Sequence, residues 1–284
     1  MTTVRELEQM LFAAFPAADA TPGDRIGLLV GDAQAKVTGV AIALDAKVVT
    51  IEAAANQGCS VLITHHPPFW FPPTAILKGG PSESAAIYRA TELGVSLIAM
   101  HTNLDCAPAT KGLLLGPAGF SYVAPLSLPQ ETESELITVG RTVETPEAFA
   151  ATPELFPSLG QLGVPNDKGV VSLHHLVNRY KETFGAVAKV WGHPDKVIQR
   201  LACCSGGGGS LVQRVVNAGA DCYVTGEVAY HEALVLASAD VALIELGHDL
   251  SELPYRNYLF DALLSAGIDE SALHIMGPTV SWWQ

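Results

Sequence analysis

The chain has 284 residues, of which 49% are apolar and only 16% are charged. Because disordered proteins show the opposite balance, this composition indicates a compact globular fold. Lysine and arginine together number 16 against 29 acidic residues, and the resulting net charge of −13 argues against a nucleic-acid partner. The nine histidines are the feature of the composition that needs an explanation.

The five cysteines are odd in number and form no Cys-x-x-Cys pair. This pattern favours reduced, buried residues over a disulfide framework or a zinc knuckle. The first ten residues lack the apolar core of a signal peptide, and the most apolar stretch, residues 233–246, is too short to span a bilayer. We therefore expect a cytoplasmic protein that has no membrane partner.

Helix and strand patterns alternate along the first hundred residues. Apolar residues at a spacing of three to four predict a helix over residues 4–15, and helices that end at a glycine are predicted over residues 47–58 and 82–94. Short apolar runs predict strands over residues 37–44, 60–64 and 95–100. Strands and helices that alternate through short connections predict an α/β layer with a largely parallel sheet.

A second alternation follows a less regular region, residues 105–168, which is the expected boundary between lobes. Ser172 is expected to cap a helix, and further helices are predicted over residues 210–218 and 251–266. Strands are expected over residues 187–191, 197–203, 222–225 and 241–246.

The predicted fold is therefore two α/β lobes with mixed, largely parallel sheets and a metal site in the cleft between them. The first lobe is expected over residues 1–125, the second over 126–245, and a closing segment, 246–284, is expected to pack back on the first lobe.

His65 and His66 directly follow the predicted strand 60–64, in the motif THHPP. Ligands of α/β proteins bind at the carboxyl ends of the strands, so this pair is well placed to hold a metal. Neighbouring residues of a strand face opposite ways, so both rings can serve one site only if the chain turns, or if two metals lie side by side. Two adjacent histidines can also occur without binding a metal.

Two further motifs follow predicted strands in the same way. Asp105 ends the motif HTNLD after strand 95–100; its two oxygens could bridge two cations, although such a residue more often serves a turn or a cap. In GHDLSE, after strand 241–246, a helix cap at Ser251 would place Glu252 in the first turn and His248 just before it. The alternative is that Ser251 and Glu252 are only a favourable helix start.

Three strand ends together thus supply three histidines and two carboxylates. Nitrogen and oxygen ligands of this number suit Mn, Fe, Co or Zn, and they are too many for one tetrahedral zinc that keeps an open position. Two divalent ions per chain are the natural count, and a pair of metals about 3.5–4 Å apart can assist hydrolysis.

The order of the motifs resembles the Nif-three-like proteins, also called GTP cyclohydrolase I type 2 homologues. The segments DRIGLLVGD, VLITHHPP, HTNLD, GGGGSLV, TGEVAYHEAL and GHDLSE follow in the order of that family, over nearly the whole chain. The resemblance implies His65, His66, Asp105, His248 and Glu252 as metal ligands, with the two carboxylates bridging. It also implies a ring-shaped homohexamer. The chain departs from the family at Asp249, where many members carry an aromatic residue, and it has no room for the extra middle domain of some members.

Other residues near these motifs are candidates for catalysis or substrate binding. His101, which is not among the ligands implied by the resemblance, could orient a ligand or act as an acid or base, or simply pack at the strand end. Glu227 and His231 lie four residues apart and would share a face of a helix, where they could line the cleft or pair with each other. Gly207 and Gly208 belong to a four-glycine turn that could cradle an anion or could serve only close packing.

Two hypotheses for the function follow. The first is a metal-dependent hydrolase that acts on a small substrate, nucleotide-like or a phosphoester. The second is a metal-binding hexameric scaffold or interaction protein without turnover. Trp282 and Trp283 at the C-terminus are expected to form an edge or subunit contact.

Overall fold

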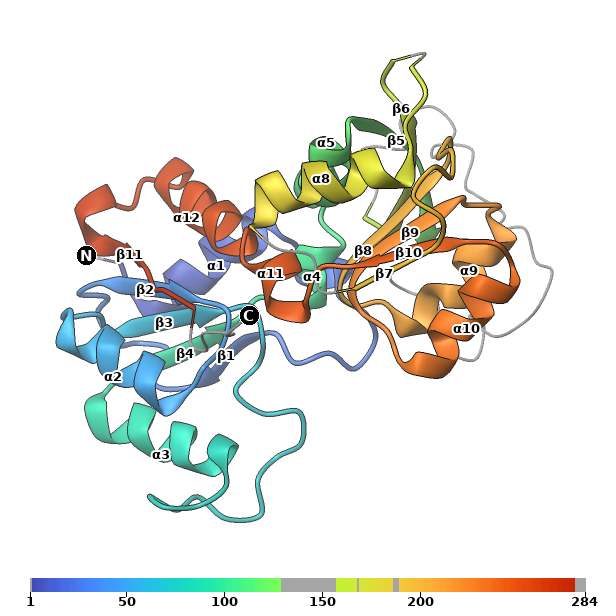
Figure 1. The fold of residues 1–284 in the computed structure, drawn as a ribbon. Helices are drawn as coiled ribbons and strands as arrows, with labels where there is room; N and C mark the ends of the chain where they lie inside the picture. Colours follow the sequence, from blue (N-terminus) through green and yellow to red (C-terminus); the bar gives the residue numbers. More distant parts are fainter. Residues whose placement is uncertain (1, 129–156, 168, 186–188, 279–284) are drawn as a thin grey trace. The chain divides into compact units, whose positions relative to one another are not determined.

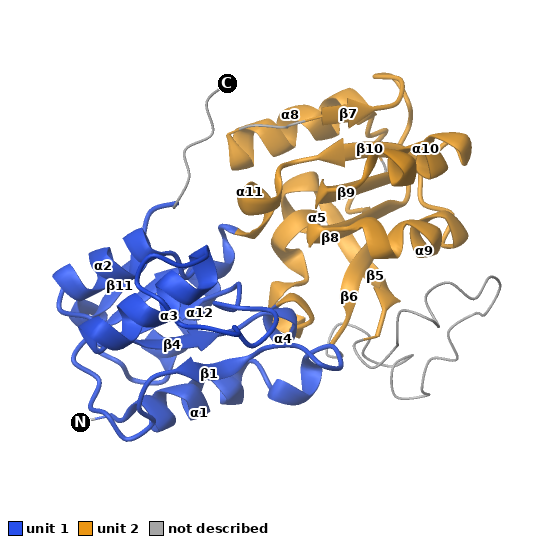
Figure 2. Cartoon of the chain, turned by 90° about the horizontal axis from the view of Figure 1, so that it is seen from below, with its two compact units in different colours: residues 1–104, 253–284 blue, residues 105–252 orange. Residues whose placement is uncertain are grey.

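The computed structural model describes residues 2–128, 157–167, 169–185 and 189–278 (Figure 1). The chain forms two compact units, which are coloured separately in Figure 2. Unit 1 consists of Met1–Leu104 and Leu253–Gln284, and unit 2 of Asp105–Glu252. The chain therefore passes between the units at two peptide bonds, one before Asp105 and one after Glu252.

Unit 1 contains a sheet of five strands in the order β1-β4-β3-β2-β11. The strands are β1 (Gly27–Val30), β2 (Val40–Ala43), β3 (Val61–Thr64), β4 (Ser96–Ala99) and β11 (Leu273–Ile275). Strands β4, β3, β2 and β11 are parallel, whereas β1 pairs antiparallel to β4 at one edge. The carboxyl ends of β2, β3 and β4 consequently lie side by side.

Helices cover this sheet, as Figure 1 shows. The helices of unit 1 are α1 (Val4–Ala14), α2 (Val48–Asn56), α3 (Ser82–Leu93), the single turn α4 (Thr102–Asp105, which ends one residue inside unit 2) and α12 (Tyr255–Ser265), with short 3-10 turns at Ala17–Asp19 and Glu270–Ala272. Helix α1 begins with a capping box, in which Thr3 and Glu6 each accept a hydrogen bond from the other's backbone amide. Helix α2 packs against α3, and α1 packs against α12.

The strands of unit 1 are apolar on both faces because both faces are covered. Leu62 and Leu97 pack with Ile51 of α2 and Ala90 of α3 in one hydrophobic cluster. The alternate strand residues are equally buried, as for Ile63 at 0% exposure. A parallel sheet buried on both faces explains the short, continuous apolar runs of the sequence.

Unit 2 contains a sheet of six strands in the order β5-β6-β8-β9-β10-β7. The strands are β5 (Phe120–Ser127), β6 (Leu159–Pro165), β7 (Lys189–Trp191), β8 (Leu201–Gly207), β9 (Cys222–Glu227) and β10 (Ala242–Glu245). Strands β8, β9 and β10 are parallel, and the other three pairs of neighbours are antiparallel. The prediction of an α/β fold with two mixed sheets is thus confirmed.

The helices of unit 2 again pack in pairs, α5 with α8 and α9 with α10. They are α5 (Gly112–Ala118), α8 (Leu173–Phe184), α9 (Val212–Asn217), α10 (Tyr230–Ser238) and α11 (His248–Glu252), with 3-10 turns at Pro108–Thr110 and Gly209–Leu211. The Ser172 hydroxyl accepts a hydrogen bond from the His175 amide, so the predicted cap of α8 is present. Within the described part of the chain, no helix is long and apolar enough to cross a membrane.

Several element boundaries differ from the predicted ones. Residues 105–125 were expected in the first lobe, but they lie in unit 2, where β5 pairs with β6 inside the second sheet. Strand β8 begins at Leu201 rather than at residue 197 and runs into the glycines, as far as Gly207. The predicted closing helix over residues 251–266 is two helices, α11 and α12, which meet at the chain crossing after Glu252. Trp282 and Trp283 lie outside the described residues.

Candidate metal centre

Three histidine rings converge at the carboxyl edge of the unit 1 sheet. His65 and His66 follow β3 directly, and His101 follows β4 after one residue. The ring centroids are 5.1 Å apart for His65 and His66, 5.1 Å for His65 and His101, and 6.0 Å for His66 and His101. The strand-end convergence that the sequence predicted therefore includes His101 as well.

A side-chain hydrogen bond turns the chain at the histidine pair. The Thr64 hydroxyl donates to the His66 carbonyl at 2.7 Å. The amides of His65 and His66 still bond to carbonyls at the end of β2, at 3.4 and 3.0 Å. Because the chain turns while it stays attached to the neighbouring strand, both rings remain at the same edge, although neighbouring strand residues normally face opposite ways.

Each of these three histidines is held through its Nδ1 atom. His65 Nδ1 lies 2.9 Å from the Met100 carbonyl, His66 Nδ1 lies 3.0 Å from Asp45 Oδ1, and His101 Nδ1 lies 2.9 Å from Asp24 Oδ1. A carbonyl oxygen only accepts, so Nδ1 of His65 carries the proton and Nε2 of the neutral ring carries the lone pair. Metal-binding histidines are typically oriented by such a bond from the other ring nitrogen, and these rings therefore fit a metal centre.

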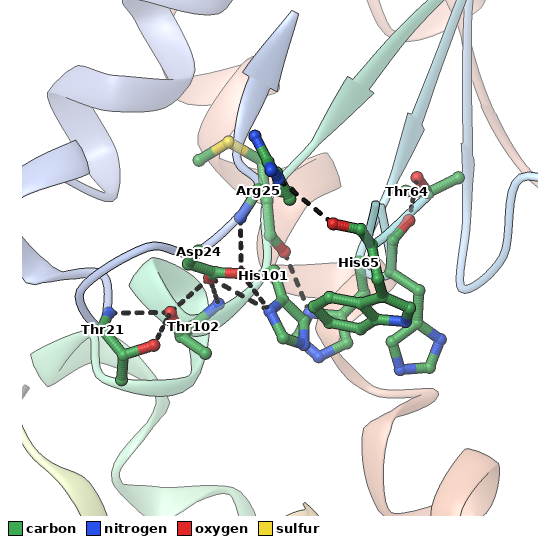
Figure 3. Close-up of polar contacts among 10 residues, drawn as sticks. Thr21, Asp24, Arg25, Thr64, His65, His101 and Thr102 are labelled. Atoms are coloured by element: carbon green, nitrogen blue, oxygen red, sulfur yellow. Dashed lines mark hydrogen bonds and ion pairs between the residues drawn. The ribbon is translucent and has the colours of Figure 1, made fainter. Parts of the chain in front are cut away.

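Asp24 was quoted in the sequence motif DRIGLLVGD but was not predicted as a site residue. Its carboxylate accepts from the His101 ring, from the Thr102 amide at 3.0 Å and from the Thr102 hydroxyl (Figure 3). Burial alone would raise the pKa of Asp24, but the hydrogen bonds from His101 and Thr102 and the charge of His101 outweigh it and lower that pKa to about 2. Asp24 is thus an anionic anchor for His101.

Asp105 ends the helical turn α4, four residues after His101. We call the three histidines at the carboxyl edge of the unit 1 sheet, His65, His66 and His101, the histidine edge. The turn α4 is continuous with it, since the Leu104 amide bonds to the His101 carbonyl at 2.8 Å. The ligand atoms of His65, His101 and Asp105 all lie within 4.8 Å of one another. The predicted carboxylate therefore accompanies the histidines, and it is also the first residue of unit 2.

In unit 2, His248 and Glu252 occupy one face of α11. His248 Nε2 lies 3.3 Å from Glu252 Oε2, and His248 Nδ1 lies 2.9 Å from Glu227 Oε1. The prediction that Ser251 caps the closing helix is wrong, because Ser251 lies inside α11 and its hydroxyl accepts from the Gly206 amide at 2.9 Å. The bond from Gly206 ties α11 to the end of β8, and the Ser251 hydroxyl also donates to the His248 carbonyl within α11 at 2.8 Å.

The expected helical pairing of Glu227 and His231 is not present. Glu227 is the last residue of β9, whereas His231 belongs to α10, so the two residues do not share a helix face. The Glu227 carboxylate instead holds Nδ1 of His248. His231 makes a nearly perpendicular ring contact with Tyr230, its neighbour in the chain.

The four-glycine turn makes room for close packing. A Cβ on Gly206, whose φ is +61°, would lie 2.0 Å from Glu252 Oε1. A Cβ on Gly208 or Gly209 would meet Tyr223 and Thr225, or the Glu232 carboxylate, at 2.3–2.4 Å. Carboxylates beside this turn, together with a Gly208 amide already bonded to the Glu227 carbonyl at 3.0 Å, favour packing over anion binding.

Chain connectivity limits how far Glu252 can lie from the histidine edge. Tyr255, at the start of α12 in unit 1, stacks obliquely on His65 with ring centroids 4.8 Å apart. Glu252 precedes Tyr255 by three residues, and three residues span at most about 11 Å. The two carboxylates at the chain crossings, Asp105 and Glu252, are each a few residues from a side chain of the histidine edge.

The family described as Duf34/NIF3 (NGG1p interacting factor 3) matches residues 2–276. A protein of Clostridium acetobutylicum named "GTP cyclohydrolase 1 type 2 homolog" is 27% identical over 256 residues, 89% of this chain and 84% of that protein. A homolog of the same name from Streptomyces coelicolor is 26% identical over 90% of this chain and 83% of its own length.

Solved structures share the fold over nearly the whole chain. The Staphylococcus aureus hypothetical protein SA1388 superposes with a TM-score of 0.79 at 22% identity, covering 99% of this chain and 98% of that one. A Bacillus cereus protein related to NIF3 superposes with a TM-score of 0.75 at 18% identity, covering 97% and 96%.

Proposed function

Because the chain belongs to the Duf34/NIF3 family, we propose that it binds two divalent metal ions and hydrolyses a small substrate. The observation that carries the proposal is the shared anchoring of the histidines: His65, His66 and His248 each have Nδ1 held by a carbonyl or a carboxylate at 2.9–3.0 Å. In each ring this arrangement assigns Nε2 as the ligand atom. Nitrogen and oxygen donors without cysteine suit Zn, Fe, Mn or Co.

We assign His65, His66, Asp105, His248 and Glu252 as the ligands. Asp105 and Glu252 would supply the carboxylate oxygens that hold the metal, and each lies at a chain crossing. When bound, divalent cations supply Lewis acidity, which polarises a scissile group and lowers the pKa of water. The residues of this chain fix the donors and keep the histidine edge largely shielded, as the 1% exposure of His65 indicates.

We assign His101 as the residue that moves protons. The Asp24 carboxylate holds its Nδ1, which orients the ring. Nε2 of His101 can then accept a proton from attacking water and return it to a leaving group. The structure supports His248 as the partner of Glu227, so Glu227 is a positioning residue for His248 rather than an acid or base.

The names of the relatives suggest a GTP-like substrate, and nucleotides are accordingly among the substrates to test. The second candidate function, a metal-binding scaffold without turnover, has the same ligand set and differs only in the outcome of that test. We further propose a homohexamer in the cytoplasm; light scattering after gel filtration would then give six times the chain mass of 29.9 kDa.

The test loads the purified protein with Mn, Fe, Co or Zn and measures metal by elemental analysis and turnover on GTP and model phosphoesters. We expect about two metal equivalents per chain. The double variant His65→Ala with Glu252→Ala should lose metal and turnover together, whereas His174→Ala, in an exposed histidine of α8, should lose neither.

Turnover that persists unchanged in the double variant would refute the hydrolase. Two metal equivalents without turnover on any substrate would favour the scaffold. A wild-type protein without bound metal would refute both functions.

A further inference from the structure

An exposed tryptophan stands beside the proton-transfer histidine. Trp70 follows the histidine motif in the segment HHPPFWFPP, and 47% of its surface is exposed. Its indole meets the His101 ring nearly at a right angle, with centroids 5.0 Å apart. A large aromatic surface that is left half open to solvent next to candidate catalytic groups is typical of a ligand contact rather than of a core.

An arginine fixes the backbone at this tryptophan. Arg25 Nε donates to the Trp70 carbonyl at 3.3 Å. Arg25 is half-buried; its backbone amide donates to Asp24 Oδ1, but no carboxylate accepts from its guanidinium in the part of the chain that the structure describes. In a protein of net charge −13, a half-buried guanidinium without an acidic partner leaves its two Nη groups to bind an anion.

Asp24 and Arg25, neighbours in the chain, thus fix the two groups in question, the His101 ring and the backbone at Trp70. The Asp24 carboxylate holds the His101 ring (Figure 3), and the Arg25 side chain donates to the Trp70 carbonyl. All four residues belong to unit 1, so their relative positions do not depend on unit 2. The indole face, the guanidinium and the reactive histidine form one connected set.

We propose that Trp70 and Arg25 are the substrate-recognition residues of the site, and that they select a planar aromatic ring that carries an anionic group. Trp70 stacks on the ring, and Arg25 donates to the anion. The inference rests on the proposed function in that the recognised molecule is the substrate of the metal centre. It adds the class of substrate and the residues that select it.

The test measures binding by calorimetry with three probes: AMP, adenosine and ribose 5-phosphate. AMP has both features, adenosine lacks the anion, and ribose 5-phosphate lacks the ring. Stacking on an indole does not discriminate strongly between bases, so AMP represents the class. The full chain is used, both metal-loaded and after treatment with EDTA, and we expect AMP to bind more tightly than either fragment in both states.

The variants separate the two contacts. Trp70→Ala should weaken AMP binding about tenfold, and Trp70→Phe should restore most of it. Arg25→Gln should weaken AMP binding about tenfold but leave adenosine binding unchanged. The matched controls are Phe71→Ala, an aromatic neighbour that is 81% exposed, and Arg200→Gln, an exposed arginine of unit 2; neither should change binding.

The proposal is overturned if AMP binds no more tightly than ribose 5-phosphate, if it does not bind at all, or if Phe71→Ala weakens it as much as Trp70→Ala. Metal content is measured on the same samples. A protein that takes up no metal when it is loaded, but still binds AMP through Trp70 and Arg25, would refute the metal centre and keep the recognition residues. A metal-loaded protein that does not bind AMP would keep the metal centre and refute the recognition residues.

Discussion

The two units place polar side chains at the carboxyl ends of parallel strands, but with different chemistry. In unit 1 the ends of β3 and β4 carry three histidines, each fixed by an acceptor at 2.9–3.0 Å, and His65 is 1% exposed. In unit 2 the ends of β8 and β9 carry the short helix α11, whose His248 side chain is 38% exposed and is held by Glu227, which is 62% exposed. Unit 1 offers histidine nitrogen donors, of which His65 is the most buried; unit 2 offers the buried Glu252 carboxylate beside the more exposed His248.

This difference leads to an expectation of how much the ligands of each unit would contribute to the proposed metal centre. A buried ring that is held by a backbone carbonyl cannot easily be replaced by water, because the surrounding chain fixes its position. An exposed ring on a five-residue helix has water as a competing ligand. We therefore expect unit 1 to set the affinity for metal and unit 2 to complete the coordination.

The largest expected effect is the loss of metal affinity when a histidine ligand is removed, and it should differ between the two units. His65→Ala should lower metal affinity more than about 100-fold, since it removes a rigid donor whose loss leaves a gap. His248→Ala should lower it by about tenfold, because water can enter at the exposed position. Competition with a fluorescent chelator measures both values, and equal losses would contradict the comparison.

The next effect tests the residues that hold the ligands. Asp45→Asn, which disturbs the bond to His66, should lower metal affinity about 10–100-fold, and Glu227→Gln, which disturbs the bond to His248, by less than about tenfold. Asp24→Asn serves as the matched control, because we assign its partner His101 to proton transfer. A loss of metal affinity in that variant as large as in Asp45→Asn would make His101 a ligand instead.

Much of the histidine edge was predictable because it depends on local pattern. A short apolar run that ends in His65-His66 is visible in the sequence, and adjacent parallel strands bring such ends together without further information. The mixed α/β class follows from the same alternation. The ends of α11 and α12 were not predictable, because Ser251 is a good cap by composition but serves instead to bind the Gly206 amide.

The anchors of the histidines could not have been found from spacing. Asp24 is 77 residues from His101, and Asp45 is 21 residues from His66. No periodicity relates such positions: the pairing of β1 with β4 brings Asp24 to His101, and the pairing of β2 with β3 brings Asp45 to His66. The partner of Glu227 was missed for the same reason, since the nearby His231 was the obvious candidate by distance along the chain.

A smaller effect tests how closely α11 packs on unit 2. Gly206→Ala would place a Cβ 2.0 Å from Glu252 Oε1 on a backbone with positive φ, so we expect a loss of about 1–3 kcal/mol in the free energy of unfolding. Gly207→Ala is the control, because nothing lies within 4 Å of its added Cβ. Urea denaturation compares them, and equal stabilities would refute the close approach of α11.

The smallest effect concerns acid stability in unit 1. The pKa of Asp24 is lowered to about 2 in the folded protein from an ordinary value of 3.8. The unfolded chain therefore takes up the proton first, so stability from Asp24 is complete above about pH 5 and is lost as pH falls towards 2. The shift corresponds to about 2 kcal/mol.

In metal-free protein, Asp24→Asn should flatten this loss in urea titrations between pH 5 and 2. Asp195→Asn, in a side chain of unit 2 that is 91% exposed, should leave the loss as it is. If the stability of Asp24→Asn falls with pH as steeply as that of the wild type, Asp24 does not hold His101 as a carboxylate anion. The contrast between the firmly held histidines of unit 1 and the more exposed His248 of unit 2 would then lose its support from charge.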